Sequence, residues 1–254
     1  MSIANTARRR RIVIGLLWVL VLPLPAWANL SRNASGPQAM GEAGAFTLDS
    51  AAELERDGGA SAWIVETGVQ YALSARLQFL LEAVFYERQE LAEGESASGM
   101  GDADLTLSWL LAKERGPWPP LVLAGKLKLP TARAGEIGTG KADYSLLAIL
   151  AKEYGELELA LETEFVSHGS PAGEALKDQF LYTLALDFSV NDYLSLYGEI
   201  LGESEPVAGE GRSDAALAGF ELEWPISAAT APYLSLEADT ESVVALRAGI
   251  EWSW

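Results

Sequence analysis

Apolar and polar residues alternate along most of this chain with a period of two, which is typical of β-strands with one face in an apolar environment. Twelve segments show the alternation, and turn-rich stretches separate them. Most are about ten residues long, the length that a tilted strand needs to cross the apolar layer of a bilayer. The segments cover approximately residues 45–55, 61–72, 75–89, 102–113, 121–130, 142–153, 156–167, 178–190, 193–203, 213–224, 232–239 and 243–254.

The seventh segment, residues 156–167, shows the alternation most clearly. One face carries Leu157, Leu159, Leu161, Thr163 and Phe165, and the other carries Glu156, Glu158, Glu162 and Glu164. Such faces fit a soluble sandwich with the acids in water, and they also fit a membrane barrel with the apolar face in lipid. The segments alone leave both folds open.

The connections between the segments favour the barrel. Short connections lie at 73–74, 154–155 and 191–192, and longer ones lie near 91–101, 131–141, 168–177 and 204–212. Bacterial outer-membrane barrels have short periplasmic turns and longer outer loops, and an even number of strands places both termini in the periplasm. We therefore predict an all-β fold, a transmembrane antiparallel barrel of about twelve strands.

Aromatic residues gather near the ends of the predicted strands, as two girdles at the membrane interfaces would require. The predicted outer edge carries Trp63, Phe85, Tyr144, Phe165 and Phe180. The predicted periplasmic edge carries Tyr71, Trp118, Tyr154, Phe188, Tyr193, Trp224, Tyr233, Trp252 and Trp254. The pattern around Gly249, Trp252 and Trp254 also resembles the C-terminal signal by which Gram-negative outer-membrane barrels are recognised for assembly. It implies the bilayer and the barrel assembly machinery as partners.

The first residues have the features of a secretory signal peptide. Arg8 to Arg11 are basic, Ile12 to Leu22 are mostly apolar, and Ala26-Trp27-Ala28 is a small-x-small cleavage site. We expect a signal peptide at 1–28, an N-terminal periplasmic or lumen segment at 29–43, and the barrel at 44–254. Export by this route would place the protein in the outer membrane of a Gram-negative cell.

Composition narrows the functional classes. The formal charge is -18 and becomes -22 without residues 1–28, which contain four arginines and no acids. So acidic a chain does not bind nucleic acid through its charge. The absence of cysteine excludes disulfides, thiol nucleophiles and thiolate metal sites. No motif indicates a cofactor or a metal ion.

The predicted inner face is polar and mostly acidic, which suits a water-filled lumen better than a dry core. Rings of carboxylates favour cations, and a few basic residues oppose them. Arg88 is also assigned to this face. The expected pore-lining residues are Glu66, Glu82, Lys126, Lys128, Glu158, Glu162, Asp187, Glu199, Glu221 and Arg247.

His168, the only histidine, stands two residues before Ser170. The spacing resembles the His-x-Ser of outer-membrane phospholipase A and of lipid A deacylases, where histidine acts as a base for serine. No third residue that could orient the imidazole is evident, and both side chains are expected to face the lumen. A polar loop tip is the simpler interpretation, so we expect no catalytic residues.

The middle of the chain carries a further resemblance. The stretch from Lys126 to Thr131, followed by Gly138 to Tyr144, resembles a strand-loop-strand signature of the outer-membrane protein family named after the meta-pathway of phenol degradation. The resemblance implies a barrel that passes small hydrophobic or aromatic compounds. Its loop, with Gly138, Gly140, Lys141 and Asp143, could fold inward as a constriction, and Lys141 could pair with Asp143.

The sequence therefore predicts a passive channel or transporter for small molecules. A closed structural barrel without a pore and a hydrolase that uses His168 and Ser170 are the alternatives.

Overall fold

The computed structural model describes residues 40–254 except 58, 91–93, 134–136, 171–175 and 205–212. The predicted signal peptide, 1–28, and the segment 29–39 lie outside the described residues. The regular elements of the described part are strands: β1 (Phe46–Asp57), β2 (Ala60–Ser74), β3 (Leu77–Glu90), β4 (Ser96–Gly99), β5 (Ala103–Ala112), β6 (Leu121–Leu129), β7 (Asp143–Tyr154), β8 (Leu157–Ser167), β9 (Gln179–Asn191), β10 (Leu194–Glu203), β11 (Ser213–Glu223), β12 (Thr230–Asp239) and β13 (Val243–Ser253).

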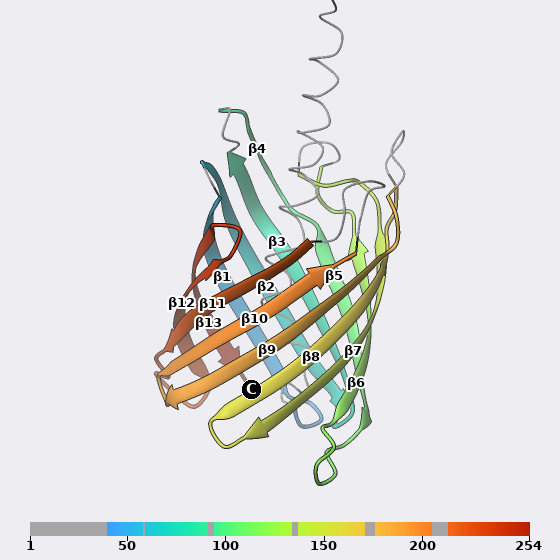
Figure 1. Ribbon diagram of the computed structural model, residues 1–254, viewed down its shortest axis with the longest axis vertical. Coiled ribbons are helices and arrows are strands. Elements are labelled where there is room, and N and C mark those ends of the chain that lie inside the picture. Colours follow the sequence, from blue (N-terminus) through green and yellow to red (C-terminus); the bar gives the residue numbers. More distant parts are fainter. Residues whose placement is uncertain (1–39, 58, 91–93, 134–136, 171–175, 205–212) are drawn as a thin grey trace, which may run out of the picture.

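These strands form a closed antiparallel barrel of twelve strands (Figure 1). β4 and β5 pair one after the other with the same strand, β3, so together they occupy one place in the barrel. β1 closes the sheet by pairing with β13, from Thr47 opposite Ser253 to Asp57 opposite Val243. Closure gives the first and last strands a partner on both sides, so neither exposes a row of unpaired backbone donors and acceptors. The predicted fold class is confirmed.

Each of the twelve predicted segments corresponds to a strand whose ends differ from the prediction by at most two residues. The structure has one further strand, β4, which corresponds to no predicted segment because it lies in a stretch predicted to be a connection. Its residues, Ser96–Gly99, include no large apolar side chain and give no apolar alternation. They form a strand because their backbone pairs with Glu87–Glu90 of β3.

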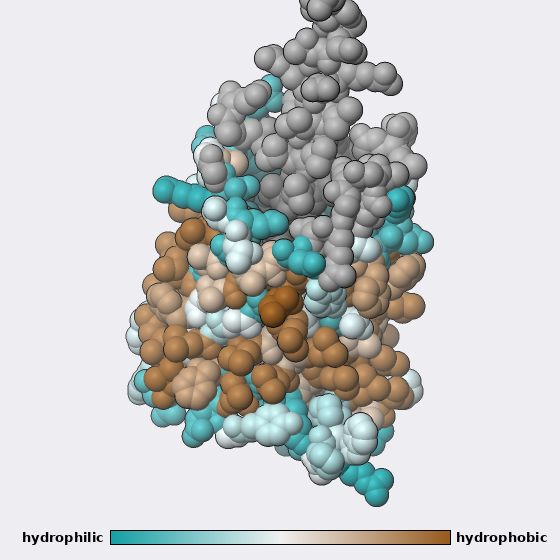
Figure 2. Space-filling view, viewed as in Figure 1, coloured by the Kyte–Doolittle hydropathy of each residue, from teal (hydrophilic) through white to brown (hydrophobic). Residues whose placement is uncertain are grey.

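An apolar band crosses the visible face of the barrel, with polar residues above and below it (Figure 2). The band arises from the strand alternation, since outward side chains are apolar and inward ones are often polar. On β8, Leu159 and Leu161 are each 40% exposed, whereas Glu162 and Glu164 are 4% and 1% exposed. The band is the surface that lipid would cover.

The two ends of the barrel differ in their connections. At the turn end, short turns join β2 to β3, β7 to β8 and β9 to β10. At the opposite end, the loop end, lie the ends of β3, β6, β8 and β10, which longer connections follow. Phe46 and Trp254 meet at the turn end, where their backbones exchange two hydrogen bonds and their ring centroids are 5.5 Å apart. In bacterial barrels the turn end faces the periplasm. No helix in the described part is long and apolar enough to cross a bilayer.

Candidate functional site: a charged lumen

The ten expected pore-lining residues lie on the inward faces of their strands. Glu158, Asp187, Glu199 and Glu221 line a cavity, and Glu162 is almost fully buried in the barrel. Glu66, Lys126, Lys128 and Arg247 form salt bridges inside the barrel. Glu82 lies on the same face of β3 as the buried Leu80 and packs near Gly68 of β2. Their part in conduction stays a prediction.

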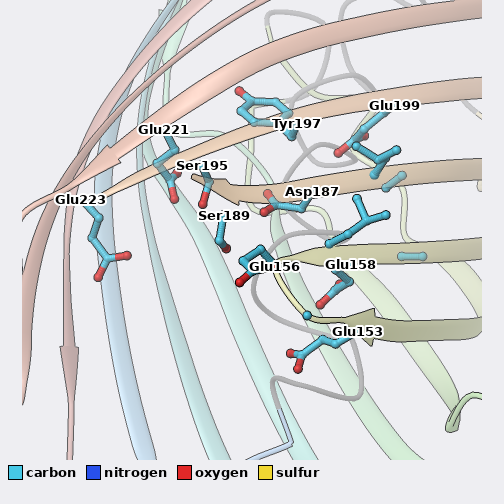
Figure 3. Close-up of a pocket in the computed structure, with 15 residues that line it drawn as sticks. Glu153, Glu156, Glu158, Asp187, Ser189, Ser195, Tyr197, Glu199, Glu221 and Glu223 are labelled. Atoms are coloured by element: carbon cyan, nitrogen blue, oxygen red, sulfur yellow. The ribbon is translucent and has the colours of Figure 1, made fainter. Parts of the chain in front are cut away.

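An acidic cavity of about 440 Å³ opens on the side of the lumen formed by the turn-end halves of β8 to β11 (Figure 3). None of the described residues that line it is basic. Two serines and Tyr197 also line it, together with small and apolar residues. The carboxylates of the acidic cavity are Glu153, Glu156, Glu158, Asp187, Glu199, Glu221 and Glu223.

Glu153 and Tyr197 are lining residues that the sequence analysis did not single out. The sequence contains an indication of each position. Glu153 is two residues after Ala151 and four after Ile149, both buried, so the alternation of β7 places it on the inward face. Tyr197 lies opposite Gly219 of β11, and its ring occupies the space where a glycine leaves room. A tyrosine and a glycine opposite each other on neighbouring strands therefore mark an inward ring that lies flat on the wall.

The other side of the lumen holds an arginine cluster centred on Arg247 of β13. Arg247 forms salt bridges with Glu66 of β2 and with Asp49 and Glu53 of β1, the last two at 3.3 and 3.5 Å. Its Nε also donates to the hydroxyl of Tyr233 at 3.1 Å. The cluster therefore joins four strands across the seam where the barrel closes.

Tyr233 was placed in the periplasmic aromatic girdle by its position near a strand end, and this placement is wrong. Its hydroxyl donates to Asp49 at 3.2 Å inside the barrel, and its ring lies against Gly249 of β13. Strand parity decides the matter, because Tyr233 shares the face of Ser235, which is buried.

The two lysines of β6 also have acidic partners. Lys126 lies 2.9 Å from Glu164 of β8. Lys128 forms a salt bridge with Asp143 of β7 and lies 3.8 Å from Asp102. Both lysines are thus bound to carboxylates, and neither is among the residues that line the acidic cavity.

Arg88, assigned to the inner face, points away from it. Its side chain is 49% exposed and pairs with Glu90, while the flanking Glu87 and Gln89 are buried. The register between β2 and β3 shifts at Val65 and Glu66, so that β3 has one extra residue there. Such a bulge reverses the parity of everything beyond it.

The described parts of the connection between β6 and β7, residues 130–133 and 137–142, contact Asp102, the residue before β5. Asp102 accepts a hydrogen bond from the backbone of Ala132, and a Cβ on Gly138 would come within 3.2 Å of its carboxylate. Gly140 has a φ of 67°, which favours glycine. The expected partner of Asp143, Lys141, is exposed, and Asp143 instead binds Lys128.

His168 and Ser170 do not form a catalytic pair. The Nε2 atom of His168 lies 2.6 Å from Oε1 of Gln179, and its Nδ1 atom lies 3.4 Å from Asp143. The Ser170 hydroxyl instead accepts a hydrogen bond from the backbone of Leu176. Both ring nitrogens of His168 therefore face groups other than a serine nucleophile.

An apolar cluster lines the inner wall on β5, β6 and β7. Leu110, Val122 and Ile149 form it, and Met40 packs against them. Met40 belongs to the segment that precedes β1, so that segment contacts the lumen wall at this point. The acidic cavity and this apolar cluster give the lumen two chemically different walls.

Neither a protein-family model nor a curated protein sequence matches the chain. Solved structures of outer-membrane channels do match its fold. An outer-membrane channel from Pseudomonas putida F1 has a TM-score of 0.58 at 16% identity, over 84% of this chain and 96% of that one. The NanC porin has a TM-score of 0.57 at 9% identity, over 81% and 98%. The KdgM porin, solved in complex with disordered oligogalacturonate, has a TM-score of 0.53 at 10% identity, over 82% and 99%. At these identities the likeness concerns the fold.

Proposed function

We propose that this protein is a passive outer-membrane channel for small molecules that prefers cations. The observation that carries the proposal is the acidic cavity inside a closed barrel, where seven carboxylates line the wall and no described lining residue is basic. Carboxylates on a pore wall raise the local concentration of cations and repel anions. The salt bridges of Lys126, Lys128 and Arg247 support a preference for cations, because nearby acids offset the positive charges of these three residues.

The resemblance to the phenol meta-pathway family suggests hydrophobic or aromatic solutes. The apolar cluster of Leu110, Val122 and Ile149 is at most 8% exposed and Met40 packs against it, so the finer proposal rests on the resemblance and not on an open apolar surface. The resemblance and the acidic cavity together favour solutes with an apolar body and no negative charge.

Reversal potentials across planar bilayers test the charge preference. The refolded full chain should favour K⁺ over Cl⁻ in a KCl gradient, and the double variant Glu158→Gln with Glu221→Gln should be less selective. The exposed Glu95 is not among the residues that line the cavity, so Glu95→Gln is the charge-matched control for the single variant Glu158→Gln and should leave selectivity unchanged. The preference should also weaken in salt, because screening shortens from ~10 Å at 0.1 M to ~3 Å at 1 M. Absence of conductance in every condition would favour the closed structural barrel, and anion selectivity would contradict the proposal.

Uptake into liposomes tests the solute class. Benzylammonium and benzoate are aromatic ions of similar size and opposite charge, and benzylammonium should enter faster. An aliphatic ammonium ion of similar mass separates the aromatic preference from the charge preference. Equal rates for the aromatic and aliphatic cations would remove the aromatic part of the proposal and leave the channel.

We also propose export by residues 1–28 and assembly in the outer membrane through the pattern around Gly249, Trp252 and Trp254. Cell fractionation should recover the protein with the outer membrane, beginning at Asn29. Deletion of residues 252–254 should prevent assembly, which heat-modifiable migration on gels detects. Recovery as soluble periplasmic protein would contradict the membrane assignment.

A further inference from the structure

The imidazole of His168 lies at the loop end of the lumen, where three strands begin or end. His168 directly follows β8, Asp143 begins β7 and Gln179 begins β9. The Nε2 atom is 2.6 Å from Oε1 of Gln179, and the Nδ1 atom is 3.4 Å from Oδ2 of Asp143. The side chain of His168 is 18% exposed, so water competes with these contacts only in part.

The surrounding hydrogen bonds show whether each ring nitrogen of His168 donates or accepts a hydrogen bond. The amide nitrogen of Gln179 donates to the carbonyl oxygen of Ser204 at 3.2 Å, and a carbonyl can only accept. The amide oxygen of Gln179 therefore faces His168, and Nε2 must donate to it. Asp143 accepts from Lys128 and from the backbone of Gly169, as an ionised carboxylate does, so Nδ1 must donate as well. Only the imidazolium cation carries protons on both nitrogens.

The charges that face this site come from four strands or their ends. The acidic groups are Asp143 on β7, which faces the ring directly, and Glu203 on β10. Glu203 does not contact the ring; its carboxylate accepts a hydrogen bond of 3.4 Å from the amide nitrogen of Gln179. Lys128 on β6 is basic and binds Asp143, with Asp102 before β5 at 3.8 Å. Burial lowers the pKa of His168, but the hydrogen bonds to Asp143 and Gln179 outweigh it and raise the pKa above the usual 6.5.

We propose that protonated His168 is a proton-dependent clamp that joins the loop ends of β7, β8, β9 and β10. With both protons present, the ring bonds Asp143 on one side and Gln179 on the other, and Gln179 extends the connection to Ser204. Loss of one proton in alkali leaves one of the two bonds without a donor. The inference goes beyond the proposed function, because the clamp operates whether or not the barrel conducts.

The direction of the pH dependence follows from the raised pKa. The stabilisation is fully present below the pKa of an unfolded histidine, about 6.5, and is lost as pH rises through the higher pKa of the folded protein. The loop end should therefore be held more firmly in acid than in alkali.

Nuclear magnetic resonance on the refolded full chain tests the clamp, since the single histidine gives one titration without ambiguity. Nitrogen-15 shifts should report two protonated ring nitrogens at pH 6 and a pKa above 6.5. Asp143→Asn should lower that pKa by about one unit, because it removes the facing charge. Asp102→Asn is the matched control, as Asp102 contacts Lys128 rather than the ring, and it should change the pKa far less. A neutral ring at pH 6, or equal shifts in the two variants, would overturn the proposal.

Thermal unfolding tests the mechanical role. The wild type should lose more thermal stability between pH 5.5 and pH 8.5 than His168→Gln does, because the variant cannot gain or lose the proton. If His168→Gln does not fold, Gln179→Leu retains the histidine and removes one acceptor, so it should lower the pKa and reduce the same difference. Identical pH dependence of the wild type and the folded variant would show that His168 clamps nothing.

Discussion

The two sides of the lumen hold their charges differently. Where β13 meets β1, Arg247 lies among three carboxylates and a tyrosine. On the β8–β11 side, seven carboxylates line the acidic cavity, and none of its described lining residues is basic. The arginine cluster is nearly buried, with 12% of the Arg247 side chain exposed. The acidic cavity is open space bordered by polar groups.

The difference reflects how a barrel tolerates charge in its interior. Where side chains fill the lumen, a carboxylate loses its water and requires an opposite charge nearby. Where a cavity of about 440 Å³ remains, water can solvate the carboxylates, and like charges can accumulate. The arginine cluster thus holds the seam together, and the acidic cavity is available for function. Three substitutions test this comparison: one in the arginine cluster and two on strands that border the acidic cavity.

Arg247→Leu should have the largest effect on stability. It leaves Asp49, Glu53 and Glu66 together without their cation, and breaking a buried ion pair by removing one partner costs about 3–5 kcal/mol. Denaturant unfolding in lipid or detergent measures the loss. Glu158→Gln in the acidic cavity is the comparison and should cost far less. Similar losses for the two variants would mean that the two walls do not differ as described.

Leu161→Arg should have the next largest effect, because it places a cation on the apolar band near the middle of β8. The expected cost is about 2–4 kcal/mol, the cost of a cationic side chain at the bilayer midplane. Glu158 of the same strand faces the acidic cavity, so Glu158→Gln is the control on the opposite face of β8. Unfolding in lipid vesicles compares them, and a reversed order would disprove the assignment of the two faces of β8.

Gly219→Ala should have the smallest effect of the three, about 1–3 kcal/mol from overpacking. The new Cβ would come within 2.4 Å of the Tyr197 ring and 2.6 Å of the backbone oxygen of Leu236. Gly125→Ala is the matched control, since a Cβ there meets nothing within 4 Å. Thermal unfolding of both variants measures the difference. A harmless Gly219→Ala would show that Tyr197 can leave the wall at little cost.

The strands were predictable because lipid on one side and charged groups on the other impose strict alternation on β8 and its neighbours. The same rule failed beyond the bulge in β3, since Arg88 lies after an extra residue that only the pairing with β2 reveals. Tyr233 was misplaced because an aromatic near a strand end fits the girdle or the lumen, and only parity separates the two.

The charged site was predictable in part. Parity placed Glu158 and Glu199 inside, but it cannot state which acids share a base. Arg247 and Asp49 are 198 positions apart in the sequence, and their contact depends on the closure of the whole sheet. The same holds for His168 and Asp143, whose side chains meet because β7 and β8 pair in register. Contacts between strands require the register, which a single sequence does not contain.

The pairing of β1 with β13 has a consequence for the time course of folding. β1 is made early and must wait, with its backbone donors and acceptors unsatisfied on one side, until β13 has been synthesised and delivered. Contacts between such distant segments form slowly, because a long loop of chain must be ordered before they form. No closed barrel can therefore form from part of the chain. Premature folding of the first half would leave a sheet with two unpaired edges, at which other chains could pair and aggregate. A chain of this topology has to be kept unfolded on its way to the membrane.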